Sequence, residues 1–388
     1  MGALKVEVVR IEELGEPDWA AWRAMLAAAP ALASPYFRPE FVKIAGRISP
    51  GSAVAIFTRG GQTVGFFPHQ RRGGALQPLA APMNDYHGII ARPGEAPTLE
   101  EAAAVLKASR LNVTAWVGAT GLDGRDLGET RRTVQVRMGE GGYDAWYAER
   151  RSAQGKFFKD KERARRSMEA ELGPLRAGRG LRDPGLLDWL IGLKRDQYRR
   201  TGRHDIFACG WTADLLHALL KTDIDGFGAS MAGLWAGDRL TAIEYSMHAD
   251  DQYHFWFPAY EPSLARCSPG ILLSMDTMRL AAELGYRTFD FGFEGEHYKK
   301  YFCNEARTVR EAMVLRPGLG AAVSQAAVGV LNAAGGDRGD RLRASVRRRW
   351  AAIEACEVSR VDRFRGAVQA AGAALAKAKA GSARAVPA

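Results

Sequence analysis

The residues with the clearest chemical potential lie in the second half of the chain. Ser268, Pro269 and Gly270 precede an apolar helical pattern, and serine and proline favour the first positions of a helix. Free N–H groups and the helix dipole at such an end attract phosphate, and Gly270 would allow a pyrophosphate to approach closely. An ordinary capped helix explains the same residues, so both interpretations stay open at this point.

Two carboxylates are candidates for acid–base chemistry. Glu244 lies in a strand pattern and shares a face with Ser246, and partial burial there would raise the pKa of its carboxyl. Such a group can take a proton from an attacking amine or hydroxyl, whereas the alternative is a surface carboxylate paired with a basic residue. Asp290 alternates with Phe289 and Phe291, so it needs a polar partner if it is buried. It either orients an acceptor or hydrogen-bonds a loop.

A turn-rich loop in the first half carries consecutive hydrogen-bonding side chains: Asn84, Asp85, Tyr86 and His87. Loops held by a rigid scaffold often bind substrates, so we expect this loop to bind a sugar or amine acceptor. Asx-type turns use the same residue types structurally. No histidine or cysteine has the spacing of a metal site, and none is expected.

Composition narrows the class of protein. The chain has 388 residues, of which 47% are apolar and 25% charged, which is ordinary for a globular protein. The net charge of +10 favours a polyanionic partner such as a phosphorylated cofactor, anionic lipid or nucleic acid. The scattered cysteines, the lack of a signal-peptide core and the lack of a long apolar run predict a cytoplasmic protein.

The elements that must position these residues follow a definite order. Three strand patterns over 227–235, 239–248 and 252–260 are joined by hairpin-length turns. A helix from 269, a strand over 287–292, a short helix over 296–302 and a strand over 309–315 follow. We predict an α+β protein with units at 1–142 and 143–316, and a basic, Ala-rich helical tail over 317–388 whose end is disordered.

This order resembles the core of the GNAT acyltransferases. Several segments look like the CelD-type GNAT domain of bacterial polysaccharide biosynthesis: Pro35–Phe37, Pro82–Tyr86, Lys161–Arg166, Tyr253–Tyr260, Ser268–Leu273, Gly285–Gly292 and Tyr298–Phe302. The resemblance implies tandem GNAT-like domains, each a mixed, mostly antiparallel sheet flanked by helices. The first domain would be degenerate, in a layout similar to the Fem-type peptidoglycan aminoacyl transferases.

The resemblance also implies roles for residues. Acyl-CoA, with acetyl-CoA as the first expectation, would be the co-substrate, bound by Arg266, Ser268, Gly270, Ile271 and Lys299. Tyr298 would protonate the departing thiolate, and an amine or hydroxyl of a sugar-containing or cell-envelope acceptor would attack directly. The usual loop has the pattern Arg/Gln-x-x-Gly-x-Gly/Ala, whereas Arg266 lies four residues before Gly270 and Pro269 takes one position. The donor therefore stays open between acyl-CoA, an acyl carrier and aminoacyl-tRNA.

Two further hypotheses use the basic charge differently. An aminoacyl-tRNA-dependent Fem-like transferase would bind tRNA, which is the one nucleic acid partner expected, although the catalytic half shows no long helical-hairpin insertion. A non-enzymatic scaffold would bind polyanions, and Glu244, Asp290 and Tyr298 would then not converge. The arginines of residues 341–349 are candidates for peripheral contact with anionic lipid.

Overall fold

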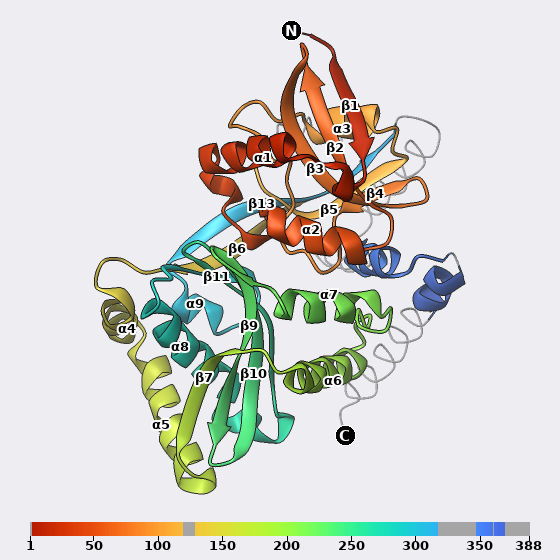
Figure 1. Cartoon of the computed structure of the whole chain (residues 1–388). Coiled ribbons are helices and arrows are strands. Elements are labelled where there is room, and N and C mark those ends of the chain that lie inside the picture. Colours follow the sequence, from red (N-terminus) through yellow and green to blue (C-terminus); the bar gives the residue numbers. More distant parts are fainter. Residues whose placement is uncertain (1, 119–128, 317–346, 360, 369–388) are drawn as a thin grey trace, which may run out of the picture.

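One continuous sheet crosses both halves of the chain in the computed structural model, which describes residues 2–118, 129–316, 347–359 and 361–368. The order of its strands is β1-β2-β3-β4-β5-β13-β6-β12-β11-β10-β9-β7, and β8 pairs with β9 (Figure 1). The strands are β1 (Leu4–Val9), β2 (Ser52–Arg59), β3 (Gln62–Arg72), β4 (Ala75–Pro78), β5 (Arg110–Trp116), β6 (Glu129–Arg137), β7 (Leu175–Leu181), β8 (Asp223–Ile224), β9 (Phe227–Ala236), β10 (Arg239–Ala249), β11 (Gln252–Tyr260), β12 (Thr288–Phe293) and β13 (Glu305–Leu315).

Helices cover both faces of this sheet. They are α1 (Glu16–Ala28), α2 (Pro39–Ile48), α3 (Leu99–Val105), α4 (Gly142–Ala153), α5 (Gly155–Leu172), α6 (Pro184–Thr201), α7 (Trp211–Leu220), α8 (Pro269–Ala282) and α9 (Lys299–Phe302). In the C-terminal half, α6 and α7 lie on one face, and α4, α5 and α8 lie on the other (Figure 1). The predicted α+β class is confirmed.

The two halves exchange strands at the centre of the sheet. β6 precedes the C-terminal half in sequence, yet it pairs with β12, and β13 lies between β5 and β6. Figure 1 shows β6 and β13 running across the junction between the halves. Each half of the sheet therefore includes or borders a strand from the other part of the chain.

The predicted antiparallel meander is present as β9, β10 and β11, with β11 at the predicted bounds. The next pairing is parallel and short. β11 pairs with β12 at Gln252–Thr288, Tyr253–Phe289 and His254–Asp290, although both strands continue beyond these residues. The strands therefore part just after His254, which leaves a gap in the sheet.

Two local features differ from the sequence expectation. The charged helical stretch over 143–172 consists of two helices, because Gln154 leaves the helical conformation between α4 and α5. β7, the edge strand beside β9, was not predicted. Its Gly178 and Gly180 weaken the strand signal, because glycine is depleted in strands.

Three apolar clusters form the core, and the largest spans both halves. It joins Trp22 and Phe66 of the N-terminal half to Leu187, Leu215 and Ile243 of the C-terminal half. The second lies under α4, α5 and α8, and the third packs beneath α3. Because the main cluster is shared, we expect the two halves to depend on each other for stability.

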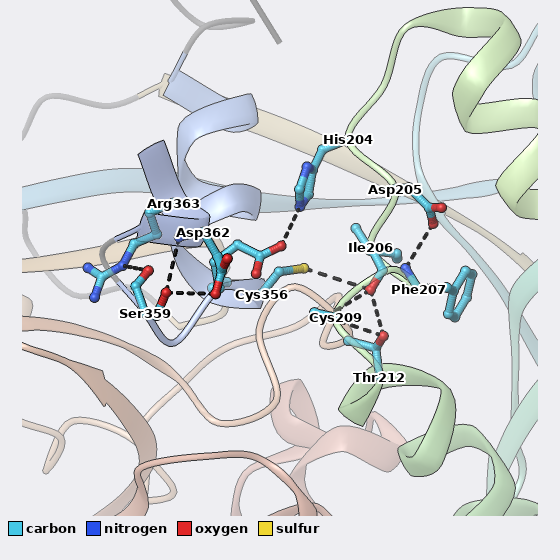
Figure 2. A network of polar contacts seen from close by, with 12 residues as sticks. His204, Asp205, Ile206, Phe207, Cys209, Thr212, Cys356, Ser359, Asp362 and Arg363 are labelled. Carbon is cyan, nitrogen blue, oxygen red and sulfur yellow. Dashed lines mark hydrogen bonds and ion pairs between the residues drawn. The ribbon is translucent and has the colours of Figure 1, made fainter. Parts of the chain in front are cut away.

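The C-terminal segment is helical over 347–356 and 361–368, which confirms the described part of the helix predicted over 350–379, and residues 369–379 of that prediction lie outside the described residues. The predicted disorder at 381–388 lies outside the described residues. Figure 2 shows the thiols of Cys209 and Cys356 directed at the carbonyl oxygen of Ile206, at 3.1 and 3.8 Å. This segment is therefore packed against the loop before α7.

Two arginines proposed for lipid contact are engaged in this region. Arg347 and Arg348 form ion pairs with Glu311 of β13 and with Glu129 of β6. Lipid contact through the rest of the basic tail stays a prediction, since residues 341–346 lie outside the described part. Among the described residues, no helix is long and apolar enough to cross a bilayer.

Candidate active site

The parted strands open onto a cavity of about 850 Å³. Its walls include Trp256 and Pro258 of β11, Phe291 and Gly292 of β12, and Gly270 near the start of α8. The gap in the sheet and the start of the helix therefore face the same space. This is the arrangement on which the proposed thioester site depends.

The start of α8 differs in detail from the expectation. Ser268 is the N-cap residue and Pro269 begins the helix, as predicted, but Ser268 has a left-handed backbone (φ 53°) and its side chain makes no capping hydrogen bond. Its Oγ instead accepts a hydrogen bond from Lys161 Nζ at 2.8 Å. The amide groups of Ile271 and Leu272 both donate to the Ser268 carbonyl oxygen. Pro269 has no N–H, so Gly270 is the residue at this end whose amide is best placed to receive a phosphate.

A second hollow of about 690 Å³ adjoins the first and shares Ile271 and Tyr298 with it. Lys156 and Lys161 of α5 line this second hollow. Two adjoining hollows, one of them with lysines on its wall, provide room for an extended anionic donor.

The other two charged residues predicted to bind the donor, Arg266 and Lys299, already have partners within the protein. Arg266 is exposed and forms an ion pair with Glu171. Lys299 is buried and donates to the carbonyl oxygens of Phe291 and Phe293, both at 2.7 Å, and it lies 2.6 Å from Glu296. All three donors of the Lys299 ammonium are therefore used, and we assign it a structural role in shaping the end of β12.

Glu244 is fully buried between β10 and α8, behind the cavity wall. Its Oε2 lies 3.5 Å from Oγ of Ser274, and Ser274 lines the cavity. Burial raises the pKa of Glu244 to about 8, so the carboxyl is mostly protonated at neutral pH but close to its titration point. A carboxyl with such a pKa can act as a general base near neutral pH.

Asp290 belongs to a buried polar network at the junction of the halves. Both of its oxygens accept from Tyr86 Oη at 2.8 Å, and Gln135 Nε2 and the Gly292 amide each donate to it at 2.7 Å. His254 Nδ1 lies 3.6 Å from Asp290 Oδ1. Of the two expectations, the structure therefore matches hydrogen bonding to a loop.

His254 is the cation of this network. Its Nε2 lies 3.1 Å from Asp85 Oδ2, so the ring stands between two carboxylates. Burial alone would lower the pKa of His254, but Asp290 and Asp85 outweigh burial and raise it to about 9. The same contacts with His254 hold the pKa of Asp290 below its usual value despite burial. A protonated His254 thus pairs with an ionised Asp290.

The loop over 84–87 is mostly a structural element. Asn84 donates to the Leu79 carbonyl and accepts from the Tyr86 amide, which is an Asx turn. His87 is buried beside the Asn84 carbonyl, and burial lowers the pKa of His87 to about 4. Asp85 is the loop residue that lines the large cavity, and acceptor binding by this loop remains a prediction that rests mainly on Asp85.

Tyr298 is half-buried and lines both hollows. Burial raises the pKa of Tyr298 above its usual range, and the charges of Glu296 and Glu244 add to this effect. The phenol therefore stays protonated over the physiological range, and Glu244 lies within its electrostatic reach. Glu244 and Tyr298 approach the same cavity, whereas Asp290 serves the network behind it.

Sequence reasoning missed two residues that shape this region, His254 and Lys194. His254 is a lone histidine whose carboxylate partner Asp85 is 169 residues away, so no spacing reveals it. Lys161 belongs to a charged run for which the sequence left two interpretations open, a solvated helix face and contact with the phosphates of the donor. Lys194 lines the cavity from α6, and an amphipathic helix pattern gives no sign of that. Among the described residues, no group of histidine, cysteine or acidic side chains could hold a metal ion.

The architecture and the gap beside α8 define an α+β protein with a GNAT fold. The sequence model of the acetyltransferase (GNAT) domain matches residues 155–300, so this part of the chain is a GNAT-type acetyltransferase domain. No curated protein sequence matches the chain. The CelD subtype inferred from sequence stays a prediction.

Solved structures with a similar course of the chain have low identity. A C-terminal domain of a putative lysylphosphatidylglycerol synthetase from Agrobacterium fabrum is 14% identical, with 81% of this chain and 97% of that one covered and a TM-score of 0.46. A tandem GNAT protein from the clavulanic acid biosynthesis pathway is 10% identical, with 81% and 100% covered and a TM-score of 0.48. FemX is 11% identical, with 80% and 97% covered and a TM-score of 0.45. These values transfer no substrate or mechanism to this chain.

Proposed function

We propose that this protein transfers an acyl group from acyl-CoA to an amine or hydroxyl of a sugar-containing or cell-envelope acceptor. The observation that carries the proposal is the parting of β11 and β12 after His254, because the gap and the start of α8 face one cavity. The thioester would lie in the gap, with its pyrophosphate at the Gly270 amide. Lys161, which bonds to Ser268, would add positive charge there.

The proposed reaction is a direct attack. The acceptor nitrogen or oxygen bonds to the acyl carbon, the carbon–sulfur bond breaks, and CoA leaves as a thiolate. Glu244 takes the acceptor's proton through the hydroxyl of Ser274, and Tyr298 gives a proton to the thiolate. Placing both substrates in one cavity supplies the orientation that such a reaction needs.

Replacing Gly270 with alanine tests the donor site. A Cβ at this position would lie 3.4 Å from Cδ1 of Tyr260, which is an ordinary contact, so the variant should fold. It would crowd the amide that receives the pyrophosphate, and we expect the dissociation constant of acetyl-CoA to rise roughly tenfold, which corresponds to about 1.4 kcal/mol. Isothermal titration calorimetry measures this constant.

Gly192→Ala is the matched control, because a Cβ at Gly192 in α6 meets nothing within 4 Å. It should bind acetyl-CoA like the native chain. Equal affinity in Gly270→Ala would remove the pyrophosphate assignment. Titration with a charged tRNA forms the second arm, and binding of tRNA without binding of acetyl-CoA would favour the Fem-like alternative instead.

A further inference from the structure

Lys194 and Arg203 stand out on the wall of the large cavity because they are cations without a carboxylate partner among the described residues. Lys194 Nζ donates to Gln197 Oε1 and to the Pro258 carbonyl, both at 3.0 Å and both neutral. No ion pair involves the Arg203 guanidinium within the described ranges. Both side chains line the same cavity.

The carboxylates of that cavity are already committed elsewhere. Asp85 pairs with His254, Glu294 with Arg132 and Glu296 with Lys299. Of the two other cations of the cavity, Lys299 is held by Glu296, and Arg131 lies 3.6 Å from Glu311 and over the ring of Phe293. Pairing within the described residues thus leaves an excess of positive charge on the α6 side.

The two cations also lie close enough to repel each other. Burial and the charge of Arg203 lower the pKa of Lys194 to about 8, and the charge of Glu296, which pairs with Lys299, offsets only part of this effect. Lys194 and Tyr198 are four residues apart on one face of α6, and the Arg203 amide bonds to the Tyr198 carbonyl at the end of that helix. Tyr198 lines the cavity as well, and it lies between the two cations in sequence.

Like charges held together without a counter-ion favour an anionic ligand. We infer that Lys194, Arg203 and Tyr198 form a subsite for an anionic group, carboxylate or phosphate, carried by the acceptor. Lys161 and the start of α8 belong to the donor side, whereas this subsite lies on α6, beside Pro258 of β11. The inference rests on the proposed function, because the ligand is taken to be the acceptor of that reaction.

Calorimetric titration of the full chain tests the subsite while free CoA saturates the donor site. The probes are glucosamine 6-phosphate, glucosaminuronate and glucosamine itself. The first carries a phosphate, the second a carboxylate, and the third has no anionic group and is the reference. We expect at least one anionic probe to bind roughly tenfold more tightly than glucosamine, as for one charge-assisted hydrogen bond. Lys194→Met and Arg203→Met should each abolish that preference and leave the affinity for CoA unchanged.

Arg200→Met is the charge-matched control, since Arg200 is exposed at the end of the same helix and bonds to the Asp196 carbonyl. It should keep the preference. Three results would overturn the subsite: no preference in the native chain, an equal loss in Arg200→Met, or a loss of CoA affinity in Lys194→Met. If CoA fails to bind but the anionic probes bind through Lys194 and Arg203, the acyl-CoA proposal falls and the anion subsite stands.

Discussion

Glu244 combines full burial with an ionisable carboxyl, which is a costly state for a residue that only supports the fold. Its polar link to the cavity runs through Ser274. Burial raises the pKa of Glu244 from 4.5 to about 8, so the folded chain loses stability as the pH rises from about 4.5 to about 8. A buried carboxyl whose pKa is raised in this way, beside a cavity, is a candidate for proton transfer.

Glu244→Gln should therefore separate activity from stability. We expect the kcat/KM of the native chain to rise with pH up to about 8 and to level off above it, because the base must be unprotonated. The variant should lose roughly 10²- to 10⁴-fold in kcat, and its free energy of unfolding should be higher than that of the native chain above pH 8. Measurements of rate against pH and of urea unfolding at pH 8.5 check both points.

The control for this comparison is Glu283→Gln. Glu283 directly follows α8, and its exposed carboxylate pairs with Arg279 of that helix. It should leave the pH profile and the stability unchanged. A flat pH profile in the native chain, or an active Glu244→Gln, would exclude Glu244 as the base.

Residue types in the sequence identified part of this site. Glu244 and Gly270 were placed correctly on a strand and a helix start because local periodicity determines those positions. Asn84, His87 and Lys299 have the right chemical types, yet they bond to backbone groups of the fold, and Lys299 also pairs with Glu296. Sequence cannot distinguish such uses, because they depend on which backbone group lies nearby in three dimensions.

At the scale of elements, the point where β11 and β12 part is held by ionic contacts between the halves. His254 of β11 stands between Asp290 of β12 and Asp85 of the N-terminal loop. Tyr36 packs edge-on against the His254 ring, with centroids 5.2 Å apart. The loop, the two strands and the short helix before α2 thus meet at one histidine.

His254→Gln removes the cation and leaves two carboxylates facing each other. We expect the free energy of unfolding at pH 7 to fall by roughly 3–5 kcal/mol, as for breaking a buried ion pair. Because the pKa of His254 is raised from 6.5 to about 9, this contribution is fully present below pH 6.5 and is lost as the pH rises through 9. Urea unfolding at pH 6, 7.5 and 9.5 measures it.

His297→Gln serves as the control, because His297 is exposed, packs against the ring of Tyr301 and has its Nε2 3.4 Å from the Tyr301 hydroxyl. It should cause a change of less than about 0.5 kcal/mol. If His254→Gln is as stable as the native chain at pH 6, the histidine is neutral in the folded state and the ionic account is wrong.

The sequence predicted most of the strands and helices, but it did not predict which strands pair with each other in the sheet. The meander follows from alternation and hairpin turns, and those are local signals. The exchange of β6 and β13 has no local signal, because a strand pattern does not name its neighbour. The resemblance to a tandem arrangement supplied the two-part plan, and the structure added the shared centre.

At the scale of the whole molecule, the C-terminal segment ties the two halves together. Glu354 is completely buried, forms an ion pair with Arg110 of β5 and accepts from Asn112 Nδ2 at 3.1 Å. Two residues later, the Cys356 carbonyl accepts from Trp211 Nε1 of α7 at 3.2 Å. One turn of helix therefore bonds to a strand of the N-terminal half and a helix of the C-terminal half.

Glu354→Ala should weaken both halves at once. Arg110 keeps about a third of its side chain exposed, so water can replace part of the lost pairing, and we expect a decrease of roughly 1–3 kcal/mol in the free energy of unfolding. Tryptophan fluorescence and circular dichroism should report a single transition that moves to lower urea by the same amount, because the largest core cluster spans the halves. Asp362→Ala removes the side-chain hydrogen bonds to Ser359 and Arg365, which belong to the same segment, and it should leave that transition in place. Two separate transitions in Glu354→Ala would mean that the halves fold independently and that the exchanged strands do not couple them.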